Sequence, residues 1–214
     1  MVVIDEAHQH TVQTDILLAL LKMLLQTTRS KDLKVIIMSA TLDAKLFNDY
    51  YPESKVELVE GRQHKVLESF LAAPSIDIVA DTITTALQCA LRERLGNILI
   101  FAPGVPEIYK VISGLERRLA SEFSDGDICP IKCYSLHAKM SNEEQDEVVN
   151  SRPPLVNGKV GRKLIVATNV AEASITINDI AIVIDMGLAN SNVYDTEYDC
   201  WKFFTAPISQ AQQK

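Results

Sequence analysis

The 214-residue chain has only four cysteines, and they are scattered, with no secretory leader evident before them. We therefore expect an intracellular chain with reduced thiols and no disulfides. Basic residues are also too few for a general polyanion-binding surface, because 28 acidic side chains outnumber 21 basic ones and give a net charge of −7. Any contact with nucleic acid must be local.

Signs of a zinc site or a membrane span are also lacking. Cys129 and Cys133 flank three residues, but no second pair of Cys or His stands at zinc-finger spacing. The most apolar run, residues 16–25, is interrupted by Lys22 and is far shorter than the ~20 residues that a membrane crossing needs. We expect core thiols, a buried helix and no membrane partner.

Short apolar runs alternate with segments of helical period, which is typical of an α/β fold with a parallel sheet covered by helices. The predicted strands are residues 1–4, 33–38, 56–59, 97–102, 131–134, 163–167 and 180–184. Helices are predicted at 12–26, 76–91 and 105–123, and after a capping box formed by Ser141 and Glu144. The loop at 150–161 is rich in Pro and Gly, so it should be exposed and mobile. A break in the pattern between Gly61 and Pro74 separates two lobes, 1–65 and 66–214.

Asp5 and Glu6 directly follow the first apolar strand, at the edge where parallel sheets bind ligands. A nucleotide-hydrolysing site needs one carboxylate to hold hydrated Mg²⁺ and a second to orient and deprotonate the attacking water. Asp5 suits the first role and Glu6 the second. A bare Asp-Glu pair is more often a solvated strand end. Here, however, Ser39 and Thr41 stand at the end of the next strand, where hydroxyls can link the Mg²⁺ carboxylates to a neighbouring lobe.

Four stretches, in this order and spacing, resemble the motifs of the DEAH-box helicases of superfamily 2. The first is Asp5-Glu6-Ala7-His8, followed by Thr11 and Thr14-Asp15-Ile16-Leu17. The second is Met38-Ser39-Ala40-Thr41-Leu42-Asp43. The third and fourth are residues 98–104, which resemble motif IV, and residues 167–177, which resemble motif V. Residues 157–163 and 206–209 are similar to the pre-mRNA splicing and ribosome-biogenesis branch. The resemblance covers essentially the whole chain. It implies the C-terminal half of a first RecA-like lobe (1–65) and a nearly complete second RecA-like lobe (66–214).

The resemblance also implies a function. The expected enzyme uses ATP and Mg²⁺ to translocate on single-stranded RNA without reading its sequence, and so remodels RNA or ribonucleoprotein. By the resemblance, Asp5 and Glu6 bind the metal and act in catalysis together with His8, which would bridge to the second lobe. Ser39 and Thr41 would couple hydrolysis to motion of the lobes. Thr168 and Asn169 would contact RNA, and Ser174 would sense the nucleotide. Residues 187–207 would form a strand-parting hairpin. An activator protein is a possible partner, and the nucleus is the expected location, with the cytoplasm as the alternative.

Three departures from the family pattern are present. Gln9-His10 stands where the family usually has Glu-Arg, which removes a charge pair near the site. Ala173 replaces a motif V hydroxyl, and Asn190 stands where a Lys is usual. None of these changes alters Asp5 or Glu6.

A phosphate-binding loop is missing from the sequence. No Gly-x-x-x-x-Gly-Lys-Ser/Thr occurs, so no backbone nest and lysine can hold the triphosphate. The arginine-rich motif VI is missing too, and loss of an arginine finger costs ~10³–10⁵ in rate. We therefore expect an inactive segment of a longer helicase, running from motif II to just before motif VI. The alternative is a complete, non-catalytic interaction module on a RecA-like scaffold. Another P-loop ATPase, such as a transporter subunit, would explain Asp5 and Glu6 but not the later motifs.

Overall fold

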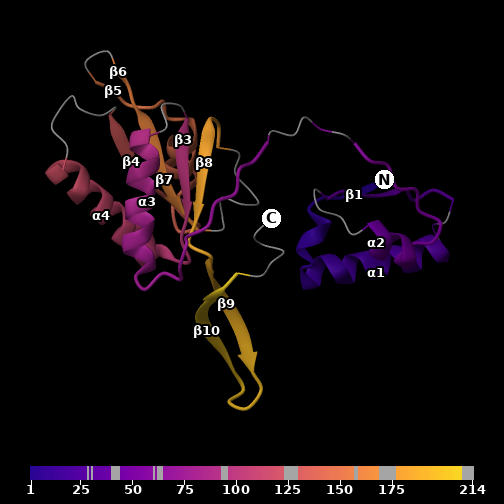
Figure 1. The fold of residues 1–214 in the computed structure, drawn as a ribbon. Coiled ribbons are helices and arrows are strands. Elements are labelled where there is room, and N and C mark those ends of the chain that lie inside the picture. The colour runs from indigo at the N-terminus through magenta and orange to yellow at the C-terminus, as the bar shows by residue number, and fades with distance from the viewer. Residues whose placement is uncertain are drawn as a thin grey trace. The chain divides into compact units, whose positions relative to one another are not determined.

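The computed structural model describes residues 1–27, 29, 31–39, 44–59, 61, 65–92, 96–122, 130–156, 159–168 and 177–208. The chain divides into two compact units, Met1–Glu68 and Ser69–Lys214, and each has its own core (Figure 1). None of the helices within the described residues is long and apolar enough to cross a membrane.

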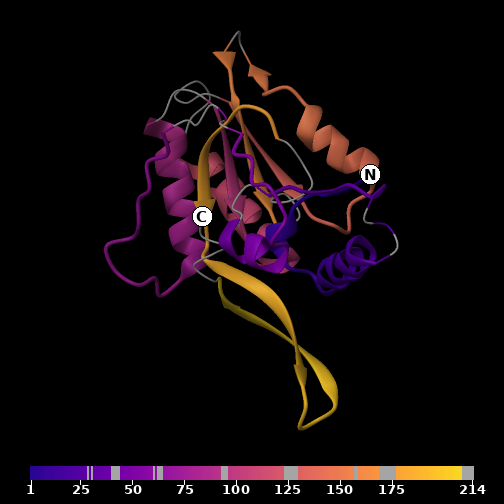
Figure 2. The same ribbon diagram turned by 90° about the vertical axis from the view of Figure 1, so that its right-hand side faces the viewer.

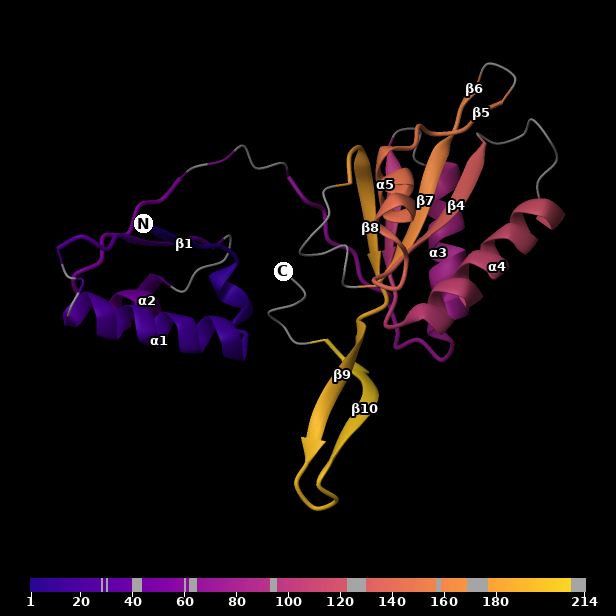
Figure 3. The ribbon, with the colours of Figure 1, turned by 180° about the vertical axis from the view of Figure 1, so that it is seen from behind.

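The first unit is a pair of parallel strands packed on helices. Its elements are β1 (Val2–Ile4), the 3-10 helix η1 (Ala7–Gln9), α1 (Val12–Gln26), β2 (Val35–Ile37) and α2 (Ala44–Tyr50). Figures 1 and 3 show α1 and α2 on the same side of the strand pair. The buried core there consists of Ile4, Ala7, Leu18, Leu21 and Phe47. This small core holds the strand ends that carry the first motif.

Helix α1 begins at a threonine cap, and its predicted span of 12–26 is confirmed. The backbone of Thr11 is extended, and its hydroxyl oxygen accepts a hydrogen bond from the N–H of Thr14 at 3.2 Å. Asp15 in the first turn places a negative charge near the positive end of the helix dipole. Leu18 and Leu21 are its buried residues, so they anchor the helix to the strands.

The second unit is built on a four-stranded parallel sheet in the order β4-β7-β3-β8. The strands are β3 (Asn97–Phe101), β4 (Ile131–Leu136), β7 (Arg162–Ala167) and β8 (Ile180–Asp185). All six residues of β7 are buried, and β3 is nearly as well covered. Strands enclosed on both faces need no polar alternation, which is why these two occupy the middle of the sheet.

Helices cover both faces of this sheet. Figures 1 and 3 show α3 (Ile78–Arg92) and α4 (Val105–Glu122) on one face and α5 (Asn142–Asn150) on the other. Gly114 of α4 allows α3 to approach closely, because a Cβ atom there would lie 2.4 Å from Cδ1 of Ile83. The sheet and α3 with α4 enclose the main core.

Two basic side chains are buried within the sheet. Lys163 is 2% exposed, and its Nζ donates to the carbonyl oxygens of Val148 and Val149 at 2.9 and 3.1 Å, in the last turn of α5. Burial lowers the pKa of Lys163. Arg162 donates from Nη1 to the carbonyl oxygen of Cys89 in α3 at 3.4 Å. These side chains tie the helices on the two faces to the same central strand.

The hairpin expected at residues 187–207 is present. Strands β9 (Leu188–Asp195) and β10 (Cys200–Pro207) are antiparallel, and Figure 2 shows them extending away from the sheet. The rings of Tyr194 and Trp201 meet edge to face across the hairpin, with centroids 5.3 Å apart. Lys202 forms an ion pair with Asp195. Trp201 and Phe203 are largely exposed.

The expected α/β fold class, with parallel sheets covered by helices, is confirmed. The capping box is also confirmed, because Ser141 N–H donates to Glu144 Oε2 at 2.7 Å and Glu144 N–H donates to Ser141 Oγ at 3.2 Å. The loop predicted at 150–161 contains a short antiparallel pair, β5 (Leu155–Val156) and β6 (Lys159–Val160).

The strand predicted at 56–59 is wrong. Leu58 and Val59 are 87% and 94% exposed and lie in irregular chain. Apolar and β-branched residues favour a strand, but a strand forms only where a partner takes up its backbone N–H and C=O groups. No pairing is found for this segment within the described residues.

Candidate functional site

Asp5 and Glu6 follow β1 at its carboxyl end, where the chain turns sharply. Glu6 has left-handed backbone angles (φ 53°, ψ 35°), and its N–H donates to Oδ1 of Asp5 at 2.9 Å. A residue other than glycine adopts this conformation rarely, and the local bond to the Asp5 carboxylate helps to hold it. Asp5 is exposed, and the Glu6 side chain is 44% exposed. Both carboxylates are therefore accessible to a ligand.

Ala7 joins the ends of the two parallel strands. It is completely buried, and its N–H donates to the carbonyl oxygen of Met38 at 3.1 Å, just beyond β2. The N–H of Met38 in turn donates to the carbonyl oxygen of Ile4 at 2.7 Å. A small residue at this position lets the turn after β1 pack against the end of β2.

His8 links the two predicted motifs of the first unit. Its Nε2 lies 3.2 Å from Oε2 of Glu6, and its Nδ1 lies 3.0 Å from Oγ of Ser39. When the ring is neutral with the proton on Nε2, its Nδ1 accepts from the Ser39 hydroxyl while Nε2 faces the carboxylate. When the ring is protonated, it donates to both. The structure therefore brings Glu6, His8 and Ser39 together, and both ring nitrogens of His8 are engaged within the first unit.

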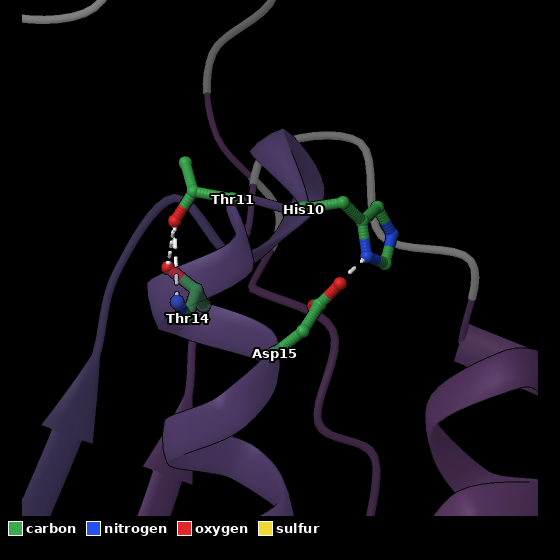
Figure 4. A network of polar contacts seen from close by, with 4 residues as sticks. All are labelled: His10, Thr11, Thr14 and Asp15. Atoms are coloured by element: carbon green, nitrogen blue, oxygen red, sulfur yellow. Dashed lines mark hydrogen bonds and ion pairs between the residues drawn. The ribbon is translucent and has the colours of Figure 1, made fainter. Parts of the chain in front are cut away.

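A second polar network connects η1 to α1 (Figure 4). The hydroxyl oxygens of Thr11 and Thr14 lie 2.8 Å apart, and Nδ1 of His10 lies 3.4 Å from Oδ1 of Asp15. The His10 ring also stacks on Phe47, with centroids 6.1 Å apart. The sequence predicted that His10, in place of the usual Arg, removes a charge pair near the site. In the structure His10 instead keeps a long contact with Asp15.

A hollow of about 250 Å³ lies beside this network. It is lined by His10, Asp15, Leu18, Leu46, Phe47 and Tyr50. Nζ of Lys22 lies over the Tyr50 ring, 3.9 Å from its centroid. The lining of the hollow is mostly apolar and includes one carboxylate, that of Asp15.

The first unit offers the donor set of a magnesium site. The described residues contain no group of three or more His, Cys, Asp or Glu side chains that could hold a metal. A zinc site requires such a group. Mg²⁺ keeps several waters and takes one or two carboxylates together with substrate phosphates, so the pair Asp5 and Glu6 fits Mg²⁺ bound to a nucleotide.

In the second unit, Thr168 lies at the carboxyl edge of the sheet. It directly follows β7, is half-buried, and donates from its N–H to the carbonyl oxygen of Leu136 at 3.1 Å. The N–H of Ala102 donates to the carbonyl oxygen of Ala167 at 2.8 Å. Backbone hydrogen bonds therefore continue the sheet beyond the carboxyl ends of β3, β4 and β7. The other predicted residues Thr41, Asn169 and Ser174 lie outside the described residues.

Asn190, which stands where the family usually has a Lys, forms contacts within the second unit. Its Oδ1 accepts a hydrogen bond from the Thr205 hydroxyl at 2.7 Å, across the hairpin. Its Nδ2 packs against Gly104, where a Cβ atom would lie 2.8 Å away. Asn190 thus joins the base of the hairpin to the chain that leads into α4.

His137 was not singled out by the sequence. The predicted strand ended at Tyr134, whereas β4 continues to Leu136 and places His137 at its carboxyl end. The buried Leu136, two residues after Tyr134, is the signal that could have extended the strand. His137 then joins Thr168 at the ligand-binding edge.

Comparison with known proteins gives a consistent result. The helicase conserved C-terminal domain family matches residues 76–202. The probable ATP-dependent RNA helicase DHR2 of Saccharomyces cerevisiae is 39% identical over 212 residues, which are 99% of this chain and 28% of that protein. The pre-mRNA-splicing factor ATP-dependent RNA helicase prp22 of Schizosaccharomyces pombe is 33% identical over 214 residues, which are 100% of this chain and 18% of that protein.

Solved structures agree. Two crystal structures of Escherichia coli HrpB, described as a DExH-box NTPase and as a DEAH/RHA helicase, both match with a TM-score of 0.78. Their sequences are 32% and 33% identical to this chain. The matched regions span 98% and 99% of this chain, but only 24% and 25% of the HrpB chains. The chain thus spans between about a sixth and a third of the relatives it matches. By these matches, the chain belongs to the helicase conserved C-terminal domain family, in its DEAH-box branch.

Proposed function

We propose that this chain is a segment of an ATP-dependent RNA helicase that couples hydrolysis of Mg-ATP to translocation on RNA and to remodelling of RNA or ribonucleoprotein. The observation that carries the proposal is the series of polar contacts Glu6, His8 and Ser39, which joins the carboxyl ends of two parallel strands. Relatives named as ATP-dependent RNA helicases, similar over the whole chain, support it.

Asp5 and Glu6 divide the hydrolytic work. Asp5 is exposed at the strand end, and the bond from Glu6 N–H occupies only part of its acceptor capacity. It holds the hydrated magnesium ion, which supplies positive charge to the phosphates when it is bound. Glu6 orients the attacking water and accepts its proton. His8 is a catalytic partner, because its contact with Oε2 restrains the Glu6 carboxylate.

Ser39 and Thr41 couple the hydrolytic site to motion of the lobes. Ser39 forms a hydrogen bond with the ring whose other nitrogen contacts Glu6, so a change in the Glu6 carboxylate reaches the end of β2 through two polar contacts. Such a series can transmit the state of the nucleotide, because each bond depends on the geometry of the next. Thr41 is the second residue to which we assign this coupling role.

The second unit carries the RNA contacts. Thr168 and Asn169 grip phosphates without reading bases, so binding is sequence-tolerant. Ser174 senses the nucleotide. The hairpin of β9 and β10, with Trp201 and Phe203 exposed, parts paired strands.

The proposed boundaries are a partial first RecA-like lobe at 1–65 and a nearly complete second lobe at 66–214. Compact units that divide between Glu68 and Ser69 support them. The splicing-factor name of one relative favours RNA processing in the nucleus. Recruitment by an activator protein is a further part of the proposal.

ATP turnover tests the proposal. The sequence has no phosphate-binding loop, so the 214-residue chain should hydrolyse no ATP above background, with or without RNA. A protein that joins this chain to such a loop and to motif VI should show RNA-stimulated, magnesium-dependent turnover. A clear rate from the chain alone would contradict both the assignment as a segment and the alternative of a non-catalytic module.

A further inference from the structure

The hollow beside His10 takes no part in the hydrolytic site proposed above. Helices α1 and α2 contribute the rest of its described lining, in which Leu18 and Phe47 are buried while Leu46 and Tyr50 are 51% and 39% exposed. Its volume of about 250 Å³ lies below the ~300–1,000 Å³ of pockets for drug-sized ligands. The hollow therefore has the size for one amino-acid side chain.

Asp15 gives this hollow a negative group with acceptor capacity to spare. Figure 4 shows its carboxylate turned toward the His10 ring, and Nδ1 lies 3.4 Å from Oδ1. A carboxylate has about four acceptor sites, and one contact of this length occupies only part of them. The chain also carries a net charge of −7, which favours the approach of a positively charged partner.

The aromatic lining suits a cation as well. Nζ of Lys22 already lies 3.9 Å from the centroid of the Tyr50 ring, so this ring face accepts a positive charge in the free protein. Lys22 belongs to α1 and is not among the described lining of the hollow. A cation that enters the hollow thus meets a carboxylate and two aromatic rings, those of Phe47 and Tyr50.

We propose that the hollow binds an arginine side chain of a partner protein. A guanidinium group is planar, so it stacks on an aromatic ring and pairs with a carboxylate through two parallel hydrogen bonds, whereas a lysine ammonium is a compact point charge. The apolar stem of arginine packs against Leu18 and Leu46. One side chain binds weakly, so the partner is a polypeptide whose other contacts add to this anchor. The inference does not depend on the proposed ATP hydrolysis.

A short peptide tests the hollow directly. The probe is acetyl-Gly-Arg-Gly-amide, added to the ¹⁵N-labelled 214-residue chain and followed by the NMR shifts of backbone amides. We expect shifts confined to α1, α2 and the turn at His10, with a dissociation constant on the order of millimolar. The same peptide with citrulline, which keeps the shape of arginine without its charge, should bind about three- to fivefold more weakly. Equal affinity for the two peptides, or shifts confined to the second unit, would overturn the proposal.

Asp15→Asn removes the charge of the carboxylate and keeps its size. It should weaken binding of the arginine peptide about three- to fivefold, a modest loss because the Asp15 side chain is 53% exposed. Glu57→Gln, at an exposed position of the same unit, is the matched control and should leave the affinity unchanged. An Asp15→Asn chain that binds as tightly as the unchanged one would contradict the proposed pair.

Two further variants test the hollow without removing Asp15. His10→Arg supplies a guanidinium from the chain itself and should abolish binding of the arginine peptide. Lys22→Met removes the cation already placed over Tyr50 and should raise the affinity about twofold, while Lys55→Met, at an exposed position of the same unit, should not. Undiminished binding to His10→Arg, or no gain with Lys22→Met, would place the arginine elsewhere and refute the assignment.

Discussion

The imidazole of His8 reaches the hydroxyl of Ser39 with Nδ1 at 3.0 Å, across 31 residues of intervening sequence. The other ring nitrogen faces Glu6, so a displacement of the proposed catalytic carboxylate alters the His8 contact with Ser39, which follows β2. The two motifs of the first unit therefore act as one polar assembly.

Replacing Glu6 tests the general base. In a protein that joins this chain to a phosphate-binding loop and motif VI, Glu6→Gln should lower the ATP hydrolysis rate by about 10²–10⁴-fold, because an amide cannot accept the proton from water. Nucleotide affinity should persist, since Asp5 remains. Glu57→Gln, at an exposed position of the same unit, is the control and should leave the rate unchanged. Comparable rates for the two variants would remove Glu6 from the mechanism.

Ser39→Ala tests coupling in the same protein. The loss of one hydrogen bond of about 1 kcal/mol should slow hydrolysis about fivefold. Unwinding should fall further, so fewer base pairs open per ATP consumed. Ser54→Ala is the matched control, because Ser54 donates to Asn48 at the surface of the same unit. Proportional losses of hydrolysis and unwinding would show that Ser39 serves hydrolysis alone.

His10→Arg should stabilise the first unit. A longer side chain can fill part of the hollow beside His10 and form a two-pronged pair with Asp15. Because Asp15 is about half exposed, the pair should add only about 0.5 kcal/mol, seen as slower amide hydrogen exchange in α1 and α2. Asp15→Asn introduced with it should cancel the gain. An equal gain without the carboxylate would mean that packing, and not the ion pair, is responsible.

Limited proteolysis should separate the two units. The first has a two-stranded sheet, and large apolar side chains are exposed on its strands and helices, among them Val3, Ile16, Met23 and Ile36. Two strands with a small core are marginally stable. We expect cleavage within residues 1–60 and a resistant core at about 66–207, identified by mass spectrometry. Equal protection of the N-terminal part would show that it is stable by itself.

Sequence patterns predicted the elements whose signals are local. The apolar residues of 12–26 predicted α1 at its full length, and Ser141 with Glu144 predicted the start of α5. The enclosed strands β3 and β7 could be predicted because each contains an unbroken apolar run, residues 98–101 and 164–167. Residues 56–59 failed, because their composition favours a strand but pairing depends on distant chain.

The contacts of the candidate site were less accessible to sequence reasoning. Motif order named Glu6, His8 and Ser39, but their contact depends on the left-handed turn at Glu6 and on the buried Ala7. Neither follows from spacing. The ring of His137, which has no hydrogen-bond partner among the described residues, is likewise a property of the folded chain, since this lack depends on the burial of the side chain.

The ammonium group of Lys163 has a consequence for how the second unit opens. It donates to two carbonyl oxygens of α5, and Val148 is the one buried residue of that helix. If α5 unfolded alone, the buried ammonium group of Lys163 would lose its two hydrogen-bond acceptors, and an unpaired buried charge is costly. The helix and strand β7 should thus melt in a single step, and this otherwise polar helix should exchange its amide hydrogens as slowly as the centre of the sheet.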